Sequence, residues 1–304
     1  MNFFEKHPIW MIVIGVIGIS LSSIFVKLST APSAVTAAWR LVWTVLLMTP
    51  VVLGREGVRR ELCSCDGKTL LLSCLSGLFL AIHFAVWFES LRHTSVASST
   101  TIVCTEVIWV SLGYCLFLKG KISLKAGAAI AVTLVGSVMI ALADSGADRG
   151  NLYGDLLALA AAAAVAVYTL IGRVVRSSAS TTVYTYLVYS VCAGVLLLLC
   201  LVRGHGLWVP GSGAVLVGLL LAIFSTILGH SIFSWCLKYF SPSFVSASKL
   251  CEPVVAVVLA GFLFGEVPGL GQLLGGGLIL GGVCAYSRIE RKELGNPVKS
   301  GKNS

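Results

Sequence analysis

The chain alternates between long apolar runs and short polar segments over most of its length. Ten apolar runs are bounded by charged residues, proline or glycine, near 8–29, 33–53, 69–91, 94–118, 122–143, 151–173, 181–202, 212–236, 243–264 and 269–288. A transmembrane helix needs about 20 predominantly apolar residues, so each run is long enough to cross a bilayer. Runs such as LLALAAAAAVAVYTLIG (156–172) do not alternate in polarity as the strands of a membrane barrel do. The pattern therefore predicts ten transmembrane helices joined by short loops.

Composition supports the same class. Hydrophobic residues make up 57% of the chain and charged residues 12%, with a mean hydropathy of +0.94. Soluble domains carry about 25% charged residues, so this chain lacks the polar side chains for a water-facing surface. We expect an all-α integral membrane protein. The first run resembles a signal peptide but is too long for its apolar region, and we interpret it as a membrane helix.

The distribution of Lys and Arg predicts the orientation. If the N-terminus is cytoplasmic, the inner segments hold 16 of the 22 basic residues and the outer loops hold 3. The outer three are Arg92, Arg149 and Arg203, and Lys27, Arg40 and Lys249 lie within apolar runs. Cytoplasmic loops carry an excess of Lys and Arg, so both termini are expected in the cytoplasm. The net charge of +9 is thus an orientation signal, and no nucleic-acid partner is expected.

The two halves of the chain resemble each other after a shift of 147 residues. Cys104 then falls on Cys251, His83 falls on His230, and Glu106 falls on Pro253, next to Glu252. Each half has five predicted crossings, an odd number, so the second half must enter the membrane from the opposite side. Inverted repeats of this kind occur in many secondary transporters. We predict one five-helix repeat over 1–147, an inverted one over 148–290, and a basic cytoplasmic tail over 291–304.

Two segments have distinctive motifs. One is AAWRLVWTVLLMTP (37–50), with Arg40 early in the second run. The other is LCEPVVAVVLAGFLFGEVPGLGQLLGGGLILGGV (250–283), with its Glu-Pro, Gly-Glu and glycine-rich end. Both segments resemble the EamA-type members of the drug/metabolite transporter superfamily. The resemblance implies a secondary transporter of small solutes, often an exporter of amino acids, metabolites or drugs. The fourth crossing departs from the family pattern, because Glu106 stands where a proline is common.

Five ionisable residues lie inside predicted crossings, where a central charge costs about 2.5–3.5 kcal/mol on insertion scales. Lys27 is near the end of its crossing and can extend to the interface. Arg40 lies deeper and is a candidate for gating, structural support or carboxylate binding. Glu106 falls at the midplane, where a role in substrate or proton handling competes with simple pairing to a cation. Lys249 and Glu252 are three residues apart, so they either neutralise each other on one helix face or line a cavity.

Aromatic residues and histidines extend this set. His83 and His230 occupy equivalent positions in the two halves, and Trp87 shares a helix face with His83. These three, with Tyr168 at greater depth, are candidates for lining a cavity, against the alternative that they only hold helices together. No second ligand stands three or four residues from either histidine, so no metal site is expected.

Proline and glycine mark two further features. Pro253 has no N–H to donate to the carbonyl of Lys249, so the pattern predicts a helix kink between these residues. Glycines crowd the run 269–288, with GxxxG spacings at 271/275 and 277/281. Small residues let helices approach closely. The run either packs against the fifth or sixth crossing of the same chain or forms a homodimer face, so the state is monomer or homodimer.

No catalytic pattern appears in the sequence. Walker A, GxSxG and HExxH motifs are absent, most of the ten cysteines lie in apolar runs, and no cofactor is expected. We predict a non-enzymatic transporter of small organic metabolites such as amino acids, in the cell membrane, working by alternating access around a midplane cavity. Export follows from the resemblance alone, and the titratable residues permit proton coupling without establishing it. Efflux of cationic aromatic drugs, and a membrane enzyme or receptor, are the alternatives.

Overall fold

The computed structural model describes residues 3–94, 96–144, 152–255, 258 and 269–295. These residues form helices and connecting turns, with no strand among them. In chain order the helices are α1 (Phe3–Lys6), α2 (Ile9–Ser20), α3 (Ser22–Lys27), α4 (Ser33–Gly54), α5 (Glu56–Cys63), α6 (Gly67–His93), α7 (Val96–Cys104), α8 (Glu106–Phe117), α9 (Leu124–Asp144), α10 (Leu152–Val175), α11 (Thr181–Val202), α12 (Ala214–Leu220), the π-helix η1 (Leu221–Ser231), α13 (Ile232–Cys236), α14 (Pro242–Lys249) and α16 (Leu270–Gly295).

Eight helical segments of the described chain are long and apolar enough to cross a membrane. They are Ile9–Lys27, Ser33–Gly54, Gly67–His93, Ser98–Phe117, Leu152–Val175, Thr181–Val202, Ala214–Cys236 and Leu270–Lys292. These eight correspond to eight of the ten predicted crossings. The predicted fifth crossing appears as α9, with a shorter apolar stretch over Leu124–Ile140. The predicted ninth, 243–264, begins in α14 and continues into residues outside the described ranges.

Polar side chains set where several helices begin. The carboxylate of Asp66 accepts from the backbone N–H of Thr69 at the start of α6. The hydroxyls of Ser180 and Ser241 do the same at the starts of α11 and α14, accepting from the third residue on. An N-cap of this type satisfies a backbone donor that has no partner inside the helix. The turn residues in the sequence therefore place the ends of the crossings.

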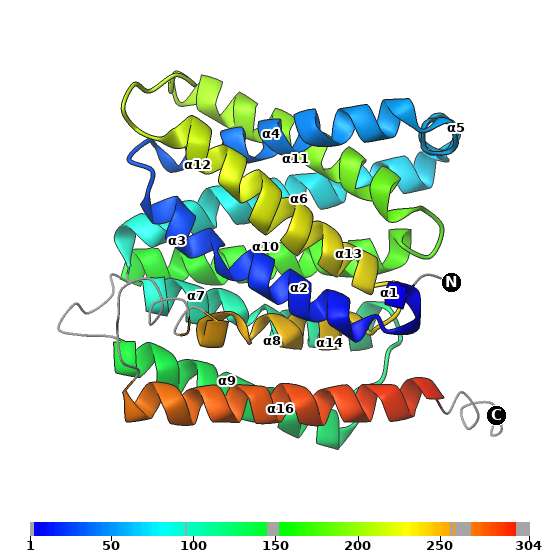
Figure 1. Ribbon diagram of the computed structural model, residues 1–304, viewed down its shortest axis with the longest axis vertical. Helices are drawn as coiled ribbons and strands as arrows, with labels where there is room; N and C mark the ends of the chain where they lie inside the picture. The colour runs from blue at the N-terminus through cyan, green and yellow to red at the C-terminus, as the bar shows by residue number, and fades with distance from the viewer. Residues whose placement is uncertain (1–2, 95, 145–151, 256–257, 259–268, 296–304) are drawn as a thin grey trace.

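Most of the long helices lie side by side along one direction (Figure 1). The helices α9 and α16 form a pair at one edge, α4, α11 and α12 lie at the opposite edge, and α10 runs through the middle. The helix α1 and the C-terminal end of α16 lie at the same end of the bundle. An even number of membrane crossings between α1 and the end of α16 would place both at the same membrane face.

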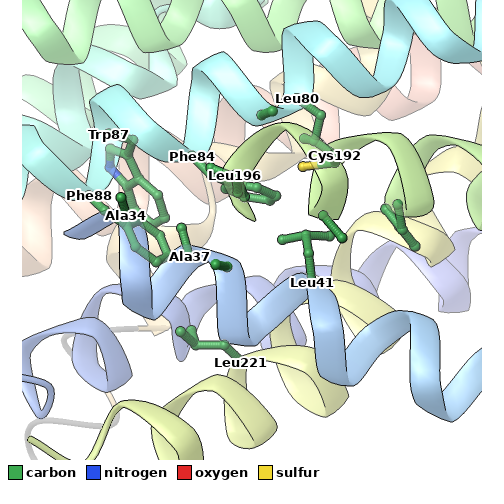
Figure 2. Close-up of a cluster of buried hydrophobic side chains, with 14 of the residues drawn as sticks. Ala34, Ala37, Leu41, Leu80, Phe84, Trp87, Phe88, Cys192, Leu196 and Leu221 are labelled. Carbon is green, nitrogen blue, oxygen red and sulfur yellow. The ribbon is translucent and has the colours of Figure 1, made fainter. Parts of the chain in front are cut away.

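A cluster of buried side chains joins α4, α6 and α11 (Figure 2). Phe84 and Phe88 of α6 are fully buried and face the small side chains of Ala34 and Ala37 on α4. Leu196 of α11 fills the space beside them. Lipid tails are as apolar as these side chains, so close packing rather than water exclusion holds such helices together. The cluster fixes α6, and α6 carries two of the candidate site residues.

The glycine-rich helix α16 packs closely on α9. A Cβ atom added to Gly136 of α9 would lie 2.6 Å from the carbonyl oxygen of Gly275. One added to Gly275 would lie 2.7 Å from the carbonyl oxygen of Gly136. The prediction that this run packs within the chain, against the fifth crossing, is confirmed at Gly275. Gly277 and Gly281 face open space, so the homodimer alternative stays a prediction.

Candidate functional site

One cavity in the interior of the bundle collects most of the ionisable residues that the sequence singled out. The space inside it that is open to water-sized molecules is about 30 Å³. The lining side chains come from both halves of the chain: Ile19, His83, Trp87, Val103, Cys104 and Glu106 from the first, and Val165, His230, Lys249 and Glu252 from the second. Six of the eight predicted binding residues therefore meet at one place. Their role in binding is a prediction that this geometry makes concrete.

A buried ion pair crosses the cavity between the two halves. The ammonium Nζ of Lys249 on α14 donates to Oε1 of Glu106 at the start of α8, at 2.8 Å. The two side chains are only 7% and 5% exposed. Nζ also lies 5.4 Å from the ring centroid of Phe233, a distance at which a cation is attracted to an aromatic face. The alternative in which Lys249 neutralises Glu252 on the same helix face is therefore wrong.

The reason lies in the backbone between Lys249 and Glu252. The helix α14 ends at Lys249, and the residues Leu250 and Cys251 form a turn before helical geometry resumes at Glu252. The amides of Leu250 and Cys251 donate three residues back, at 3.2 Å each, instead of four. Residues three apart share a face only in a continuous helix. This turn lies where the kink before Pro253 was predicted, and it separates the two charges that the helical spacing would have joined.

Two side chains that line the cavity each have a buried polar atom without a partner among the described residues. One is Oε1 of the Glu252 carboxyl group, in a side chain that is 7% exposed. The other is the indole Nε1 of Trp87, which is 5% exposed. A buried carboxyl oxygen and a buried N–H are costly to leave unpaired, so such atoms mark places where a ligand or water belongs. Together they offer one acceptor and one donor to a bound molecule.

Rings surround these polar atoms. His83 stacks on Trp87, with centroids 5.8 Å apart and planes 15° from parallel. Nδ1 of His83 donates to the carbonyl oxygen of Ala161 at 2.9 Å, which fixes the ring orientation. His230 meets His83 edge-on at 6.4 Å. The two histidines that the repeat related by sequence thus meet in one cavity wall. In the described chain no three His, Cys, Asp or Glu side chains are grouped to hold a metal ion.

Arg40 and Tyr168 were predicted at the site but lie behind the cavity wall. The Arg40 guanidinium stacks on Phe84 at 4.1 Å from the ring centroid, and Phe84 in turn meets His230 at 5.3 Å. The Tyr168 ring lies 6.1 Å from His230, and its hydroxyl shares a hydrogen bond of 2.8 Å with Ser234. Their positions along the predicted crossings placed these residues close to the cavity. Those positions could not show that aromatic rings stand between the two residues and the cavity.

The first half of the chain has a break that sequence reasoning missed. The helix α7 ends at Cys104, Thr105 forms a turn, and α8 begins at Glu106. The Thr105 amide donates to Ile102 and the Ile108 amide to Thr105, both three residues back. After the shift of 147 residues, Thr105 falls at position 252, directly after the break at 250–251. No proline is present here, and the Thr105 hydroxyl, which donates to the Ile102 carbonyl at 2.6 Å, is the visible signal.

The π-helix η1 was also missed. His230 and Thr226 both lie on it, and its wider turn presents the first to the cavity and the second to Arg40. The equivalent helix in the first half, α6, is a regular α-helix, so the two halves differ here. Most π-helices are single-turn bulges, frequently at functional sites, whereas η1 extends over 11 residues. Nothing in the apolar pattern of 212–236 separates the π geometry from an ordinary helix.

The fold and the cavity define a class of protein: a multi-pass, all-helical membrane protein whose two halves enclose a polar interior site. Residues 7–142 and 152–288 each match the EamA-like transporter family. These two segments cover most of the chain, and the protein belongs to that family. It is therefore a membrane transporter, as the resemblance in the sequence implied, and members of the family are not enzymes.

Individual proteins support the assignment. The chain is 24% identical over 236 residues to a protein named "Uncharacterized transporter YxxF" from Bacillus subtilis (strain 168), covering 77% of this chain and 75% of that protein. A solved crystal structure of a protein with 17% sequence identity superposes with a TM-score of 0.74, over 93% of this chain and 97% of that chain. At this identity the structural match shows the fold alone.

Proposed function

We propose that the protein is a secondary transporter of small organic solutes, working by alternating access around the cavity between its halves. The observation that carries the proposal is the ion pair between Lys249 and Glu106, which joins the two halves inside the site. Secondary transporters place their sites at the interface of two repeats, often where helices are broken. Both Glu106 and Lys249 lie at a helix break.

We also propose that the halves are inverted repeats. Equivalent helices of the two halves touch in antiparallel pairs, as a two-fold axis in the membrane plane requires. In α9 and α16, Gly136 meets Gly275 while Thr133, earlier in α9, meets Gly282, later in α16. Contacts between non-equivalent helices also come in matching pairs, with α6 on α10 and α2 on η1. With ten crossings, both termini lie at one membrane face, and the excess of basic residues there makes it the cytoplasmic face of the cell membrane.

The substrate class follows from the charges in the cavity. A zwitterion such as an amino acid carries an ammonium group that suits the unpaired oxygen of Glu252. Its carboxylate suits the ammonium of Lys249, in exchange for Glu106. The rings of Trp87 and His83 offer a flat apolar wall to a side chain. The direction is export, on the strength of the family resemblance.

A second candidate function is efflux of cationic aromatic compounds. The unpaired carboxyl oxygen of Glu252 beside the Trp87 ring is the observation that favours it, because buried acids and aromatic faces both attract cations. Lys249 distinguishes the candidates. It would repel a cation and attract a carboxylate, so Lys249→Ala abolishes transport of a zwitterion and spares transport of a cation.

The test is flux through purified protein in sealed proteoliposomes, using an amino-acid mixture and a mixture of aromatic amines, with and without a pH gradient. We expect amino-acid flux that Lys249→Ala and Glu252→Gln each reduce at least tenfold. Dependence on the pH gradient would establish proton coupling. Flux of amines alone, spared by Lys249→Ala, would select the second candidate. No flux of either mixture would reject the transporter proposed here.

A further inference from the structure

A second cavity opens at the end of the bundle opposite α1. Residues between Val26 and Thr36, together with Phe88, Leu91 and Arg92, line it, and we call it the vestibule. The space inside it that is open to water-sized molecules is about 360 Å³. Its charged lining residues are Lys27 and Arg92, both cationic, and no Asp or Glu is among the described residues that line it.

The acidic residue closest in sequence to Arg92 is already paired. Glu89, one turn earlier on α6, accepts from Nε2 of His93 at 3.2 Å and is not part of the vestibule lining. Arg92 donates through Nη1 to the carbonyl oxygen of Ala31 at 2.8 Å, which holds the guanidinium at the wall. A guanidinium has five N–H donors, so this bond leaves others for a ligand. The vestibule lining therefore carries two positive charges, and the carboxylate of Glu89 lies near them, close to Ser33 and Arg92.

Arg40 lies between the vestibule and the central cavity. Its guanidinium carbon is 4.1 Å from the ring centroid of Phe84, which contacts His230 in the cavity wall. It is 6.0 Å from the ring centroid of Phe88, which lines the vestibule. Phe84 and Phe88 are one turn apart on α6, with ring centroids 6.0 Å apart, and both lie beside this cation.

The bonding of Arg40 is incomplete. Its side chain is 0% exposed, and no carboxylate among the described residues lies within the 4.0 Å of an ion pair. Nε donates to Oγ1 of Thr226 at 2.8 Å and Nη1 to Oγ of Ser22 at 3.3 Å, while Nη2 has no partner. Burying a cation without a counter-charge is strongly unfavourable. An anion that visits Arg40 would relieve this cost.

We propose that Arg40 and the vestibule form the route of a substrate carboxylate, from Lys249 in the central cavity, past Arg40, to Lys27 and Arg92. This inference rests on the proposed function and narrows its substrate to molecules with a carboxylate. Each residue on this route is a cation with N–H donors available to a carboxylate. The route begins in the central cavity and ends in the vestibule. Phe84 and Phe88 are the barriers that must turn aside for passage. Arg offers a planar, bidentate fit to a carboxylate that Lys does not.

The experiment compares two matched substrate mixtures in proteoliposomes: amino acids, and the same amino acids as carboxamides, detected by mass spectrometry. The amides keep the ammonium group and lose the negative charge. Wild-type protein is expected to carry the acids at least tenfold faster than the amides. Arg40→Gln is expected to lower acid flux at least tenfold and to leave the slow amide flux within about twofold. A purely structural Arg40 would lower both fluxes together.

The vestibule is tested with Lys27→Gln/Arg92→Gln, a double change of exposed residues. We expect a three- to tenfold higher KM for the acids at low salt, shrinking as salt screens the charges. The control is Arg203→Gln, an exposed cation at the same end of the bundle but outside the vestibule, which is expected to leave KM unchanged. Equal wild-type flux of acids and amides, or an unchanged KM in the double variant, overturns this inference while transport stands. Absence of both fluxes overturns the proposed function itself.

Discussion

The ion pair between Lys249 and Glu106 makes a strong quantitative prediction about stability. Exposed ion pairs contribute about 0.2–1 kcal/mol, whereas removing one partner of a buried pair costs about 3–5 kcal/mol. With side chains only 7% and 5% exposed and a bond of 2.8 Å, this pair belongs to the second kind. Lys249→Met and Glu106→Gln should therefore each lower the free energy of unfolding by about 3–5 kcal/mol. Each change leaves one charge buried without its partner.

The double variant separates the energy of the ion pair from the effect of losing either residue alone. Because Lys249→Met/Glu106→Gln leaves no lone charge from this pair, it should be only about 0–2 kcal/mol less stable than the wild-type protein. The two single changes sum to about 6–10 kcal/mol, so the interaction energy between the two sites is about 4 kcal/mol or more, above the usual range for residues in contact. The assay is reversible unfolding in mixed detergent micelles, followed by circular dichroism for all four proteins of the cycle.

A second cycle supplies the control. Arg60 and Glu56 form an ion pair of 2.5 Å on α5, with side chains 77% and 65% exposed. The distance is as short as in the buried pair, but the coupling should be only about 0.3–0.5 kcal/mol, since water screens both charges. If the Lys249–Glu106 cycle is additive within about 0.5 kcal/mol, the buried pair is not a structural link between the halves, and the reasoning from its burial fails.

Three further predictions concern single positions. Glu252→Gln should raise the melting temperature in detergent, because it replaces a buried carboxyl group, which is costly to charge, with a neutral amide of the same shape, while amino-acid flux falls at least tenfold. Gly275→Leu should destabilise the contact of α9 and α16 by about 1–3 kcal/mol in the same unfolding assay, whereas Gly277→Ala, with open space around it, should change stability by less than about 0.5 kcal/mol. Ser241→Ala should cost about 1–2 kcal/mol, because its hydroxyl caps α14 and also donates to Glu290 at 3.0 Å. Ser177→Ala, which loses only a local bond to Val174, is its control, and equal effects of the two serine changes would contradict the cap.

The crossings were predictable because the membrane allows few solutions. A backbone in lipid must satisfy its own hydrogen bonds, so long apolar runs become helices and charged or turn residues end them. The same logic found the depth of Glu106, Lys249 and Glu252, since a charge in such a run needs a polar setting. His83 and His230 were found through the shift of 147 residues, and the structure places both in the cavity wall. The position of a residue along a crossing and the spacing between the two repeats can both be read directly from the sequence.

The direction in which a side chain points around its helix axis is harder to predict from sequence. Arg40 and Tyr168 have the depth of cavity residues, but Phe84 and His230 stand in front of them. The break at Thr105 has no proline, and the π-helix η1 has no distinctive composition. Each of these features changes the direction of the side chains that follow it. Packing between helices determines these side-chain directions, and no local sequence pattern predicts that packing.

The pairing of Lys249 depends both on its position in the sequence and on the packing of the broken helices. Helical spacing alone would join Lys249 to Glu252, because residues three apart share a face. The turn at Leu250 and Cys251 removes that face, and Pro253 favours the turn by withholding an N–H from the Lys249 carbonyl. The ammonium is then free to meet Glu106, which the matching break at Thr105 presents from the other half. Because a helix is broken in each half, Lys249 pairs with Glu106 of the other half instead of with Glu252. The Glu252 side chain then lines the cavity with a carboxyl oxygen that is available to a ligand.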